Sequence, residues 1–559
     1  MNVFLLYPHR DAETDAPLPW QAEALEQDLG LPQLYEAMAQ GDKFLHGVAR
    51  QVLLHPLEDA DLIHYRQAVL RDCLAHPDVV REIYRIPIEA QEKKREQWLG
   101  IFSRSPQGIL SSAVDLLAMF VGLLRRLKAI ADAQQGAFAS EGFRRFFAML
   151  QAELDEAYFE EVETHLRTLK FRQGVLLSAE LGPGNEGTRY TLRKPRRTPR
   201  PILKQIFDRT PSCGFTIPPR DTYGSKALGD LKDRGLNEVA NAVAQAADHI
   251  DGFLKLLQAE LAFYVGCLNL AERIGELGMP LAFPTPAPAE TRRFTASGLY
   301  DLGLALAKGA AVVGNDVQAD GKSLVVITGA NQGGKTTFLR SVGLAQLMMQ
   351  AGMFAPAQAL EANLARGVFT HFKREEDATM ESGKFDEELS RMDAIADHLR
   401  AHSLVLFNES FAATNEREGS EIARQIVDAL LESRVKVFFV THFYAFAHGY
   451  AARQASDALF LRAERLPDGR RTFKIKPGEP LPTSFGEDLY RQIFSPDGVL
   501  GLRERQAEGQ QRAEEQDELA GAGERGVEGS AAGRDDDAAG APGPRQRKRH
   551  GQRPPGEDV

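Results

Sequence analysis

One short run, from Gly329 to Thr336, constrains the fold of this 559-residue chain more than any other. It reads Gly-Ala-Asn-Gln-Gly-Gly-Lys-Thr. An apolar, β-branched run at residues 323–328 precedes it, and a helical pattern from Thr337 to Gln350 follows. Glycines let a backbone approach phosphate groups, and loop amides at a helix N-terminus attract anions. The order strand, loop, helix therefore predicts a phosphate-binding loop within an α/β domain.

The residues of this loop have separate predicted roles. We expect Lys335 to reach the β- and γ-phosphates of ATP and the Thr336 hydroxyl to bind Mg²⁺. ATP and Mg²⁺ are thus the predicted cofactors. The predicted phosphate-binding residues are Gly329, Ala330, Asn331, Gln332, Gly333, Gly334, Lys335, Thr336 and Thr337.

Two further apolar runs end in polar residues that belong with such a loop. Residues 403–407 lead into Asn408 and Glu409, and residues 435–440 lead into Thr441 and His442. We expect Glu409 to orient or deprotonate the attacking water and His442 to sense the γ-phosphate, so both are predicted as catalytic. Asn408, the second predicted Mg²⁺ contact, stands where an aspartate is usual. It offers a carbonyl oxygen without charge, which leaves slow or weak hydrolysis open.

Composition limits the other classes of function. The net charge is −11, so nucleic-acid contact would need a local basic patch. Cys73, Cys213 and Cys267 are widely spaced, which argues against a disulfide framework or a zinc site and favours a cytoplasmic location. We find no signal peptide and no apolar run long enough to span a membrane, and we expect no membrane partner.

The pattern along the chain suggests several regions. Short strands around residues 175–179 and 188–192 precede a basic stretch that is either a nucleic-acid contact or a solvated loop. From about Asn237, apolar residues recur at steps of three and four as far as Ala271, which predicts a long helix, either coiled-coil-like or buried in a bundle. The basic candidates are Arg193, Lys194, Arg196, Arg197 and Arg200. The predicted regions are a helical core (1–170), a β-rich basic insertion (171–236), the long helix and a linker (237–295), a P-loop ATPase domain (296–500) and a disordered tail (501–559).

Several motifs together resemble one family. Residues 327–340 and 351–357, the run Val440-Thr441-His442-Phe443, and Ser484-Phe485-Gly486 resemble the ATPase segment of the MutS family of DNA mismatch-repair proteins. Residues 49–57 and 65–70 are similar to the family's helical core. Gly314-Asn315-Asp316 matches the family loop that borders the adenine, so the resemblance makes Asn315 and Asp316 adenine-side candidates.

The resemblance implies a multidomain fold, α plus α/β. A helical core and lever would carry a small β-rich, clamp-like insertion, followed by a P-loop ATPase domain of the MutS type. Such ATPases form dimers, here a homodimer, in which a signature segment completes the neighbour's site. That segment would begin at Ser382 and Gly383.

The chain also departs from the family pattern. The family's Asp-Glu pair is Asn408-Glu409 here, and the glycine-rich stretch that normally follows is replaced by residues 410–415. The signature segment is two residues short. Because the chain starts at the core-like segment, we expect it to lack the family's mismatch-recognition domain.

Three hypotheses of function follow. The leading one is an ATP-dependent, DNA-binding protein of repair or recombination, a dimeric clamp that acts on double-stranded, branched or mismatched DNA. The second is an ATPase directed to RNA or the ribosome. The third, motivated by Asn408, is a nucleotide-gated scaffold with little turnover.

Overall fold

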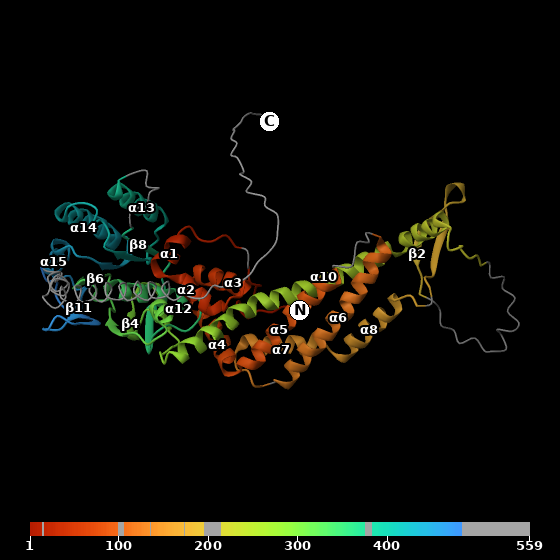
Figure 1. Ribbon diagram of the computed structural model, residues 1–559, viewed down its shortest axis with the longest axis horizontal. Coiled ribbons are helices and arrows are strands. Elements are labelled where there is room, and N and C mark those ends of the chain that lie inside the picture. Colours follow the sequence, from red (N-terminus) through yellow and green to blue (C-terminus); the bar gives the residue numbers. More distant parts are fainter. Residues whose placement is uncertain are drawn as a thin grey trace, which may run out of the picture. The chain divides into compact units, whose positions relative to one another are not determined.

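A computed structural model describes residues 1–13, 16–98, 105–134, 136–172, 174–194, 214–374 and 383–482 (Figure 1). The predicted tail and the Ser484-Phe485-Gly486 motif lie outside these residues. The prediction of a mixed helical and α/β architecture is confirmed.

The first part of the chain is helical. Several helices begin at a side-chain cap, as at Asp42, whose carboxylate accepts hydrogen bonds from the Phe44 and Leu45 amides. Ser105, Ser140 and Asp155 cap later helices in the same way. The helices are α1 (Ala22–Leu29), α2 (Leu31–Ala39), α3 (Lys43–Leu54), α4 (Ala60–Ala75), α5 (Pro77–Trp98), α6 (Pro106–Ala133), α7 (Glu141–Glu153) and α8 (Glu156–Leu169).

A two-stranded antiparallel hairpin follows, with strands close to those predicted. β1 (Leu177–Leu181) and β2 (Gly187–Leu192) flank a short 3₁₀ turn, η1 (Pro183–Asn185). A Cβ atom on Gly235, further along the chain, would lie 2.4 Å from the Leu177 side chain. The hairpin therefore packs against the following helix at Gly235, where a larger residue would clash with Leu177.

The long helix α10 (Thr222–Glu276) begins fifteen residues before its predicted start at Asn237. The apolar pattern does not predict this first part, because it contains glycines and polar residues and is mostly exposed. It forms because Asp221 caps it, accepting a hydrogen bond from the Gly224 amide at 2.8 Å. Its later part is enclosed, since every residue from Leu257 to Leu270 is buried. Contacts with α2, α3, α5 and α6 surround it, which favours the bundle interpretation over an open coiled-coil seam.

The prediction that no apolar run could span a membrane is wrong by length and composition. Both α6 and α10 contain an 18-residue window that is apolar enough. In α10, 89% of that window is buried inside the chain, and in α6 the share is 44%. Because α6 and α10 pack against each other, the α10 window is that of a core helix, and the α6 window is partly covered by it.

The remaining part of the chain is an α/β domain with two sheets. A six-stranded sheet has the order β12-β11-β6-β10-β9-β8, parallel except for β12. A four-stranded sheet has the order β3-β7-β4-β5. The strands are β3 (Thr285–Ala287), β4 (Phe294–Leu299), β5 (Asn315–Gln318), β6 (Leu324–Gly329), β7 (Ala359–Asn363), β8 (Val368–Phe372), β9 (Leu404–Asn408), β10 (Lys436–Val440), β11 (Ala458–Arg465) and β12 (Arg471–Pro477). The helices are η2 (Ala289–Thr291), α11 (Leu302–Lys308), α12 (Lys335–Gln350), α13 (Lys384–His398), α14 (Glu416–Glu432) and α15 (Tyr444–Ala452).

The region predicted as a long helix and a linker, residues 237–295, also contains strand β3. This strand has three residues, with Pro286 in the middle, and it lies at the edge of the four-stranded sheet beside β7. Proline is tolerated at such an edge position.

The six-stranded sheet is buried on both faces at β6, β8, β9 and β10, as the continuous apolar sequences of these strands predict, whereas β11 and β12 are partly exposed. On β6, Val325 and Ile327 belong to a core shared with α12 and the helical part, whereas Leu324 and Val326 belong to a second core with α14 and α15. The loop that follows β6 is therefore held by packing on either side of its strand.

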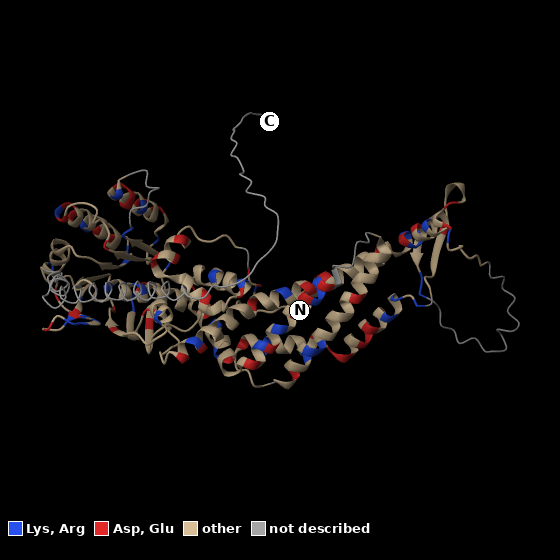
Figure 2. Cartoon of the chain, in the orientation of Figure 1, with Lys and Arg blue, Asp and Glu red and all other residues tan. Residues whose placement is uncertain are grey.

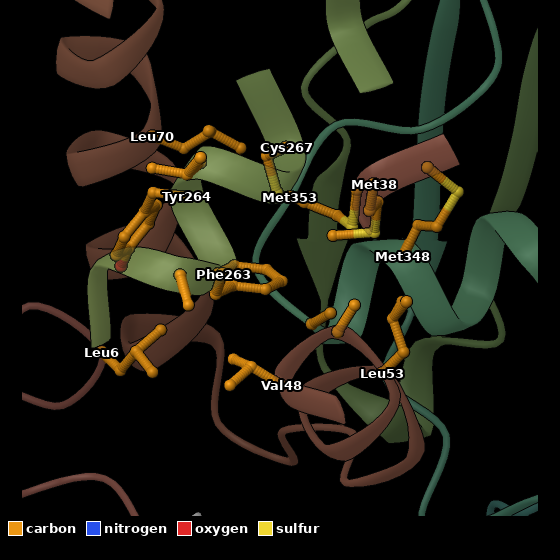
Figure 3. Packing of buried hydrophobic residues seen from close by; sticks show 14 of the residues in the cluster. Leu6, Met38, Val48, Leu53, Leu70, Phe263, Tyr264, Cys267, Met348 and Met353 are labelled. Carbon is orange, nitrogen blue, oxygen red and sulfur yellow. The ribbon is translucent and has the colours of Figure 1, made fainter. Parts of the chain in front are cut away.

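The C-terminal end of α12 is fixed to the helical part. The Gln350 side-chain Nε2 donates to the Leu57 carbonyl at 2.8 Å, and the Arg66 guanidinium donates to the Ala351 carbonyl at 3.1 Å. Figure 3 shows Met348 and Met353 beside Met38 of α2, with Tyr264 and Phe263 of α10 close by. One continuous hydrophobic core thus joins α12 to the helices.

Candidate functional site: a phosphate-binding loop at the edge of the sheet

Three neighbouring parallel strands bring the predicted site residues to one edge of the sheet. β10 lies between β6 and β9, and its register pairs Val440 with Ile327 on one side and Asn408 on the other. The ladder continues past the strand ends, since the Thr441 amide donates to the Ile327 carbonyl at 3.1 Å and the Glu409 amide to the Val440 carbonyl at 2.9 Å. Carboxyl-terminal strand edges of this kind are where ligands bind in α/β sheets.

The loop between β6 and α12 needs its glycines for conformation and for space. Gly329 and Gly334 have φ values of 106° and 91°, which side-chained residues rarely adopt. A Cβ atom on Gly333 would lie 2.7 Å from the Ala463 Cβ and 2.8 Å from the Ala330 carbonyl oxygen. The loop can therefore follow this path only with this glycine spacing.

Lys335 begins α12 and is 5% exposed. Its Nζ donates to the carbonyl oxygens of Gly329 and Ala330, at 3.0 and 3.1 Å. Burial lowers the pKa of Lys335 to about 8, and the nearby Glu409 carboxylate opposes that effect. Within the described part of the chain, both hydrogen bonds of this buried ammonium go to carbonyl oxygens, so it is a good partner for an anion that enters the loop.

Thr336 and Asn408 lie in contact, as expected of two groups predicted to share one ion. The Thr336 Oγ1 donates to the Asn408 Oδ1 at 2.8 Å. Both oxygens are uncharged, so the pair lacks the negative charge that an aspartate would supply.

Glu409 and His442 form the second contact of the site. The His442 Nε2 lies 2.6 Å from the Glu409 Oε1, and the two side chains are 34% and 30% exposed. The hydrogen bond from His442 lowers the pKa of Glu409, against the effect of burial. Glu409 is therefore an ionised carboxylate at neutral pH whose direction is fixed by His442.

A cavity of about 770 Å³ connects these groups. The loop, Glu409 and His442 line one part of it, and a mostly apolar part is formed by the end of α11, the segment before β5, and Phe473 of β12. It is lined by Leu304, Lys308, Ala311, Val312, Val313, Asn315, Asn331, Gln332, Gly333, Gly334, Lys335, Thr336, Thr337, Glu409, His442 and Phe473. Its size is in the range of small-molecule sites.

Sequence reasoning missed Phe473 and Lys308. No motif surrounds either residue, and Phe473 reaches the loop only because β12 pairs with β11, the neighbour of β6. A Cβ atom on Gly334 would lie 3.6 Å from Phe473. The available signal was the alternation of apolar and polar residues from Phe473 to Lys476, which is typical of a strand.

The two adenine-side candidates have different positions. Asn315 lines the cavity, but it also holds β12: its Oδ1 accepts the Ile475 amide at 2.7 Å, and its Nδ2 donates to the Phe473 carbonyl at 3.4 Å. Asp316 is not among the cavity residues, and its carboxylate accepts the Gly298 amide at 2.7 Å. Asp316 thus joins β5 to β4 at the irregularity of their pairing between Ala296 and Leu299.

The remaining predicted residues are only partly described. Gly383 directly precedes α13, but Ser382 lies outside the described residues. Arg193 and Lys194 are exposed at the end of β2, and the Arg193 Nε donates to the Ser178 hydroxyl at 2.8 Å. Arg196, Arg197 and Arg200 lie outside the described residues. In Figure 2, basic and acidic residues are interspersed along the helices.

The donor set fits a nucleotide better than it fits a metal ion alone. The glycine-bounded loop and the Lys335 ammonium suit a phosphate chain, and the apolar part of the cavity suits a base. Within the described ranges, no group of three or more His, Cys, Asp or Glu residues could hold a metal. Thr336 and Asn408 would therefore contact Mg²⁺ that is also held by the phosphates and by water.

Comparison with known proteins agrees with this architecture. Residues 58–277 match the MutS2 N-terminal domain, and residues 325–508 match MutS domain V. A putative endonuclease MutS2 of Bacillus subtilis is 26% identical over 361 residues, which cover 61% of this chain and 45% of the relative. A DNA mismatch repair protein MutS of Thermus thermophilus is 28% identical over 361 residues, covering 60% and 41%.

A third relative, MutS protein homolog 4 of Mus musculus, is 30% identical over 155 residues, which cover 28% of this chain and 15% of the relative. The chain spans less than half the length of these curated relatives. The two family matches lie in the same order as the helical part and the α/β part of the structure, and the resemblance seen in the motifs is confirmed. The chain belongs to the MutS family.

Proposed function

We propose that this chain binds ATP with Mg²⁺ at the edge of its six-stranded sheet, hydrolyses it slowly, and uses the nucleotide to control binding to DNA. The observation that carries the proposal is the convergence of Lys335, the Thr336–Asn408 pair and the Glu409–His442 pair on one cavity. These groups come from helix α12 and from the ends of two strands, β9 and β10, and together they supply the parts that phosphoryl transfer needs.

Each side chain then has a specific task. The Lys335 ammonium turns from its two loop carbonyls toward the β- and γ-phosphates. The Glu409 carboxylate, ionised and fixed by His442, orients the attacking water and accepts its proton. Mg²⁺, when bound with the nucleotide, neutralises charge on the phosphates. Since Thr336 and Asn408 would hold it with uncharged oxygens, we expect weak metal affinity and slow turnover.

The nucleic-acid part of the proposal is supported by the family. Relatives carry the names DNA mismatch repair protein MutS and endonuclease MutS2. In this chain the exposed basic residues at the end of β2, Arg193 and Lys194, are suited to sequence-independent phosphate contact. We propose double-stranded, branched or mismatched DNA as the ligand, and a homodimer as the acting form.

A nucleotide-gated scaffold is the second candidate, favoured by one observation. Asn408 places an uncharged oxygen, 2.8 Å from the Thr336 hydroxyl, where a carboxylate would normally strengthen metal binding. Such a site could bind ATP and change conformation with little hydrolysis.

Steady-state ATP hydrolysis separates these two functions. We expect a slow but measurable rate in the wild type, its loss in Glu409→Ala, and a wild-type rate in Glu432→Ala, an exposed glutamate at the end of α14. Tight ATP binding with no rate above that of Glu409→Ala would instead support the scaffold.

Electrophoretic binding to plain, branched and mismatched duplexes, with ribosomal RNA as a competitor, tests the ligand. The proposal predicts salt-sensitive binding to DNA that changes when ATP is added, and a weaker complex for a variant with Arg193 and Lys194 both changed to Ala. Binding to RNA in preference to every duplex would contradict it and support the RNA-directed alternative.

A further inference from the structure

The loop that carries Glu409 has a strained backbone. Glu409 and Phe411 have φ values of 53° and 63°, in the left-handed region that favours glycine. Phe411 lies in the segment that replaces the family's glycine-rich stretch, and glycine would adopt this angle without a steric clash, but this chain has side chains on both residues. Strained residues of this kind keep their conformation only where surrounding contacts fix them.

The residue between them, Ser410, is fixed by a histidine of the neighbouring edge strand. Ser410 Oγ lies 2.5 Å from the His371 carbonyl oxygen and 2.8 Å from the His371 Nδ1. The His371 Nε2 lies 2.9 Å from the backbone carbonyl of Glu388 on α13. Ser410 and His371 are both fully buried.

The histidine ring also packs on the strained residue itself. The rings of His371 and Phe411 stack with centroids 5.2 Å apart and planes 19° from parallel. His371 thus contacts two consecutive residues of the loop, Ser410 by hydrogen bonds and Phe411 by stacking.

The protons can be assigned from the partners. Burial and the nearby Arg391 guanidinium lower the pKa of His371 to about 4, so the ring is neutral at neutral pH. Its Nε2 faces a carbonyl oxygen and must carry the hydrogen, which leaves Nδ1 as an acceptor. The Ser410 hydroxyl then has one proton and two acceptors, the Nδ1 and the carbonyl oxygen, and both belong to His371.

The other side of the loop is fixed by β10. The Glu409 amide donates to the Val440 carbonyl, and the Glu409 carboxylate contacts His442, the second residue after β10. The main chain at Glu409 is therefore held between β10 and the His371–Ser410 contact on β8.

We propose that His371 is a positioning residue for ATP hydrolysis, which holds Glu409 in place through Ser410. This inference rests on the proposed ATPase activity. His371 is not among the residues that line the cavity, so its effect is on the rate of hydrolysis and not on nucleotide binding.

Two conservative substitutions distinguish positioning from general stability. His371→Asn places an oxygen near the original Nδ1 and can keep the bond to Ser410. His371→Gln places an amide near the original Nε2, which keeps the bond to the Glu388 carbonyl and loses the one to Ser410. A merely structural role would affect the two variants alike.

The experiment measures single-turnover hydrolysis and equilibrium ATP binding by the full chain. We expect the rate to fall on the order of ten- to a hundredfold in His371→Gln and Ser410→Ala, with ATP affinity within about twofold of wild type. His371→Asn should regain most of the rate. His165→Gln and Ser112→Ala, an exposed histidine and a part-buried serine of the helical part, should behave as wild type.

Other results would overturn the inference. Wild-type rates in both His371→Gln and Ser410→Ala, or equal losses in the Asn and Gln variants, would remove the positioning role. If His371→Gln fails to fold by circular dichroism, Ser410→Ala alone decides. Glu409→Gln tells the two proposals apart: if its rate equals that of wild type, the proposed ATPase mechanism fails and the inference falls with it.

Discussion

The buried lysine of the loop should make ATP binding sensitive to alkaline pH. Burial lowers the pKa of Lys335 to about 8, well below the usual lysine value. The folded protein without ATP therefore loses this proton between about pH 7 and pH 9. Bound phosphates favour the ammonium and raise its pKa again, so binding takes up a proton in that range.

The size of the effect follows from this pKa. The affinity for ATP has its full value well below pH 8 and decreases as the pH rises through 8. The reason is that a growing share of the protein must first take up a proton at Lys335. With a pKa of about 8 in the free protein that bound phosphates raise toward the ordinary lysine value, affinity should fall on the order of tenfold between pH 7.5 and pH 9.

Titration with a fluorescent ATP analogue across this pH range, without Mg²⁺, measures the effect. Lys335→Arg is the matched control, because a guanidinium stays charged throughout. We expect weaker binding by this variant at pH 7.5 but no further loss up to pH 9. A flat curve in the wild type, or equal slopes in both proteins, would refute the assignment of the proton to Lys335.

Three further predictions concern the metal pair and the contacts that hold the chain together. Asn408→Asp restores a carboxylate beside Thr336, so the Mg²⁺ concentration for half-maximal ATP hydrolysis should fall about tenfold; an unchanged Mg²⁺ titration would contradict this. Glu260→Ala removes the buried carboxylate that accepts the Leu5, Leu6 and Ala12 amides, so trypsin should cut after Arg10, whereas Glu272→Ala on the same helix should leave this bond protected. Arg66→Met leaves the Leu6 and Ala351 carbonyls without their donor and should cost about 2–4 kcal/mol, measured as a lower urea midpoint; no change in that midpoint would show that the contacts contribute little.

The sequence could predict the site where local pattern and sheet geometry act together. The run from Gly329 to Thr336 specifies its own strand, turn and helix, and strand ends in a parallel sheet meet at one edge. For this reason Asn408, Glu409 and His442 were found by following apolar runs to their last residues.

Contacts between segments far apart in the chain could not be predicted in this way. Phe473 reaches the cavity through strand pairing, and His371 reaches Ser410 through packing of β8 beside β9. Neither position carries a local motif. The early start of α10 was missed because its first residues are exposed and glycine-containing, and the helix there depends on the Asp221 cap.

Local pattern also says nothing about what a side chain does in the folded chain. Asn315 was predicted from the family resemblance to lie beside the adenine, and it lines the cavity. Its amide group is nevertheless occupied by the backbone of β12, which it holds against the site. Glu260 lies within the helical pattern of α10 and belongs to no motif, yet its carboxylate accepts hydrogen bonds from the N-terminal segment.

A crystal structure of the chain with Mg²⁺ and a non-hydrolysable ATP analogue tests the proposed site most directly. We expect a triphosphate along the loop from Gly329 to Thr336, with the Lys335 Nζ moved from the Gly329 and Ala330 carbonyls to the β- and γ-phosphate oxygens. The γ-phosphate should face Glu409. Two results would contradict the proposed ATP site. One is an analogue bound elsewhere, and the other is a Lys335 that still donates to its two carbonyls with the nucleotide present.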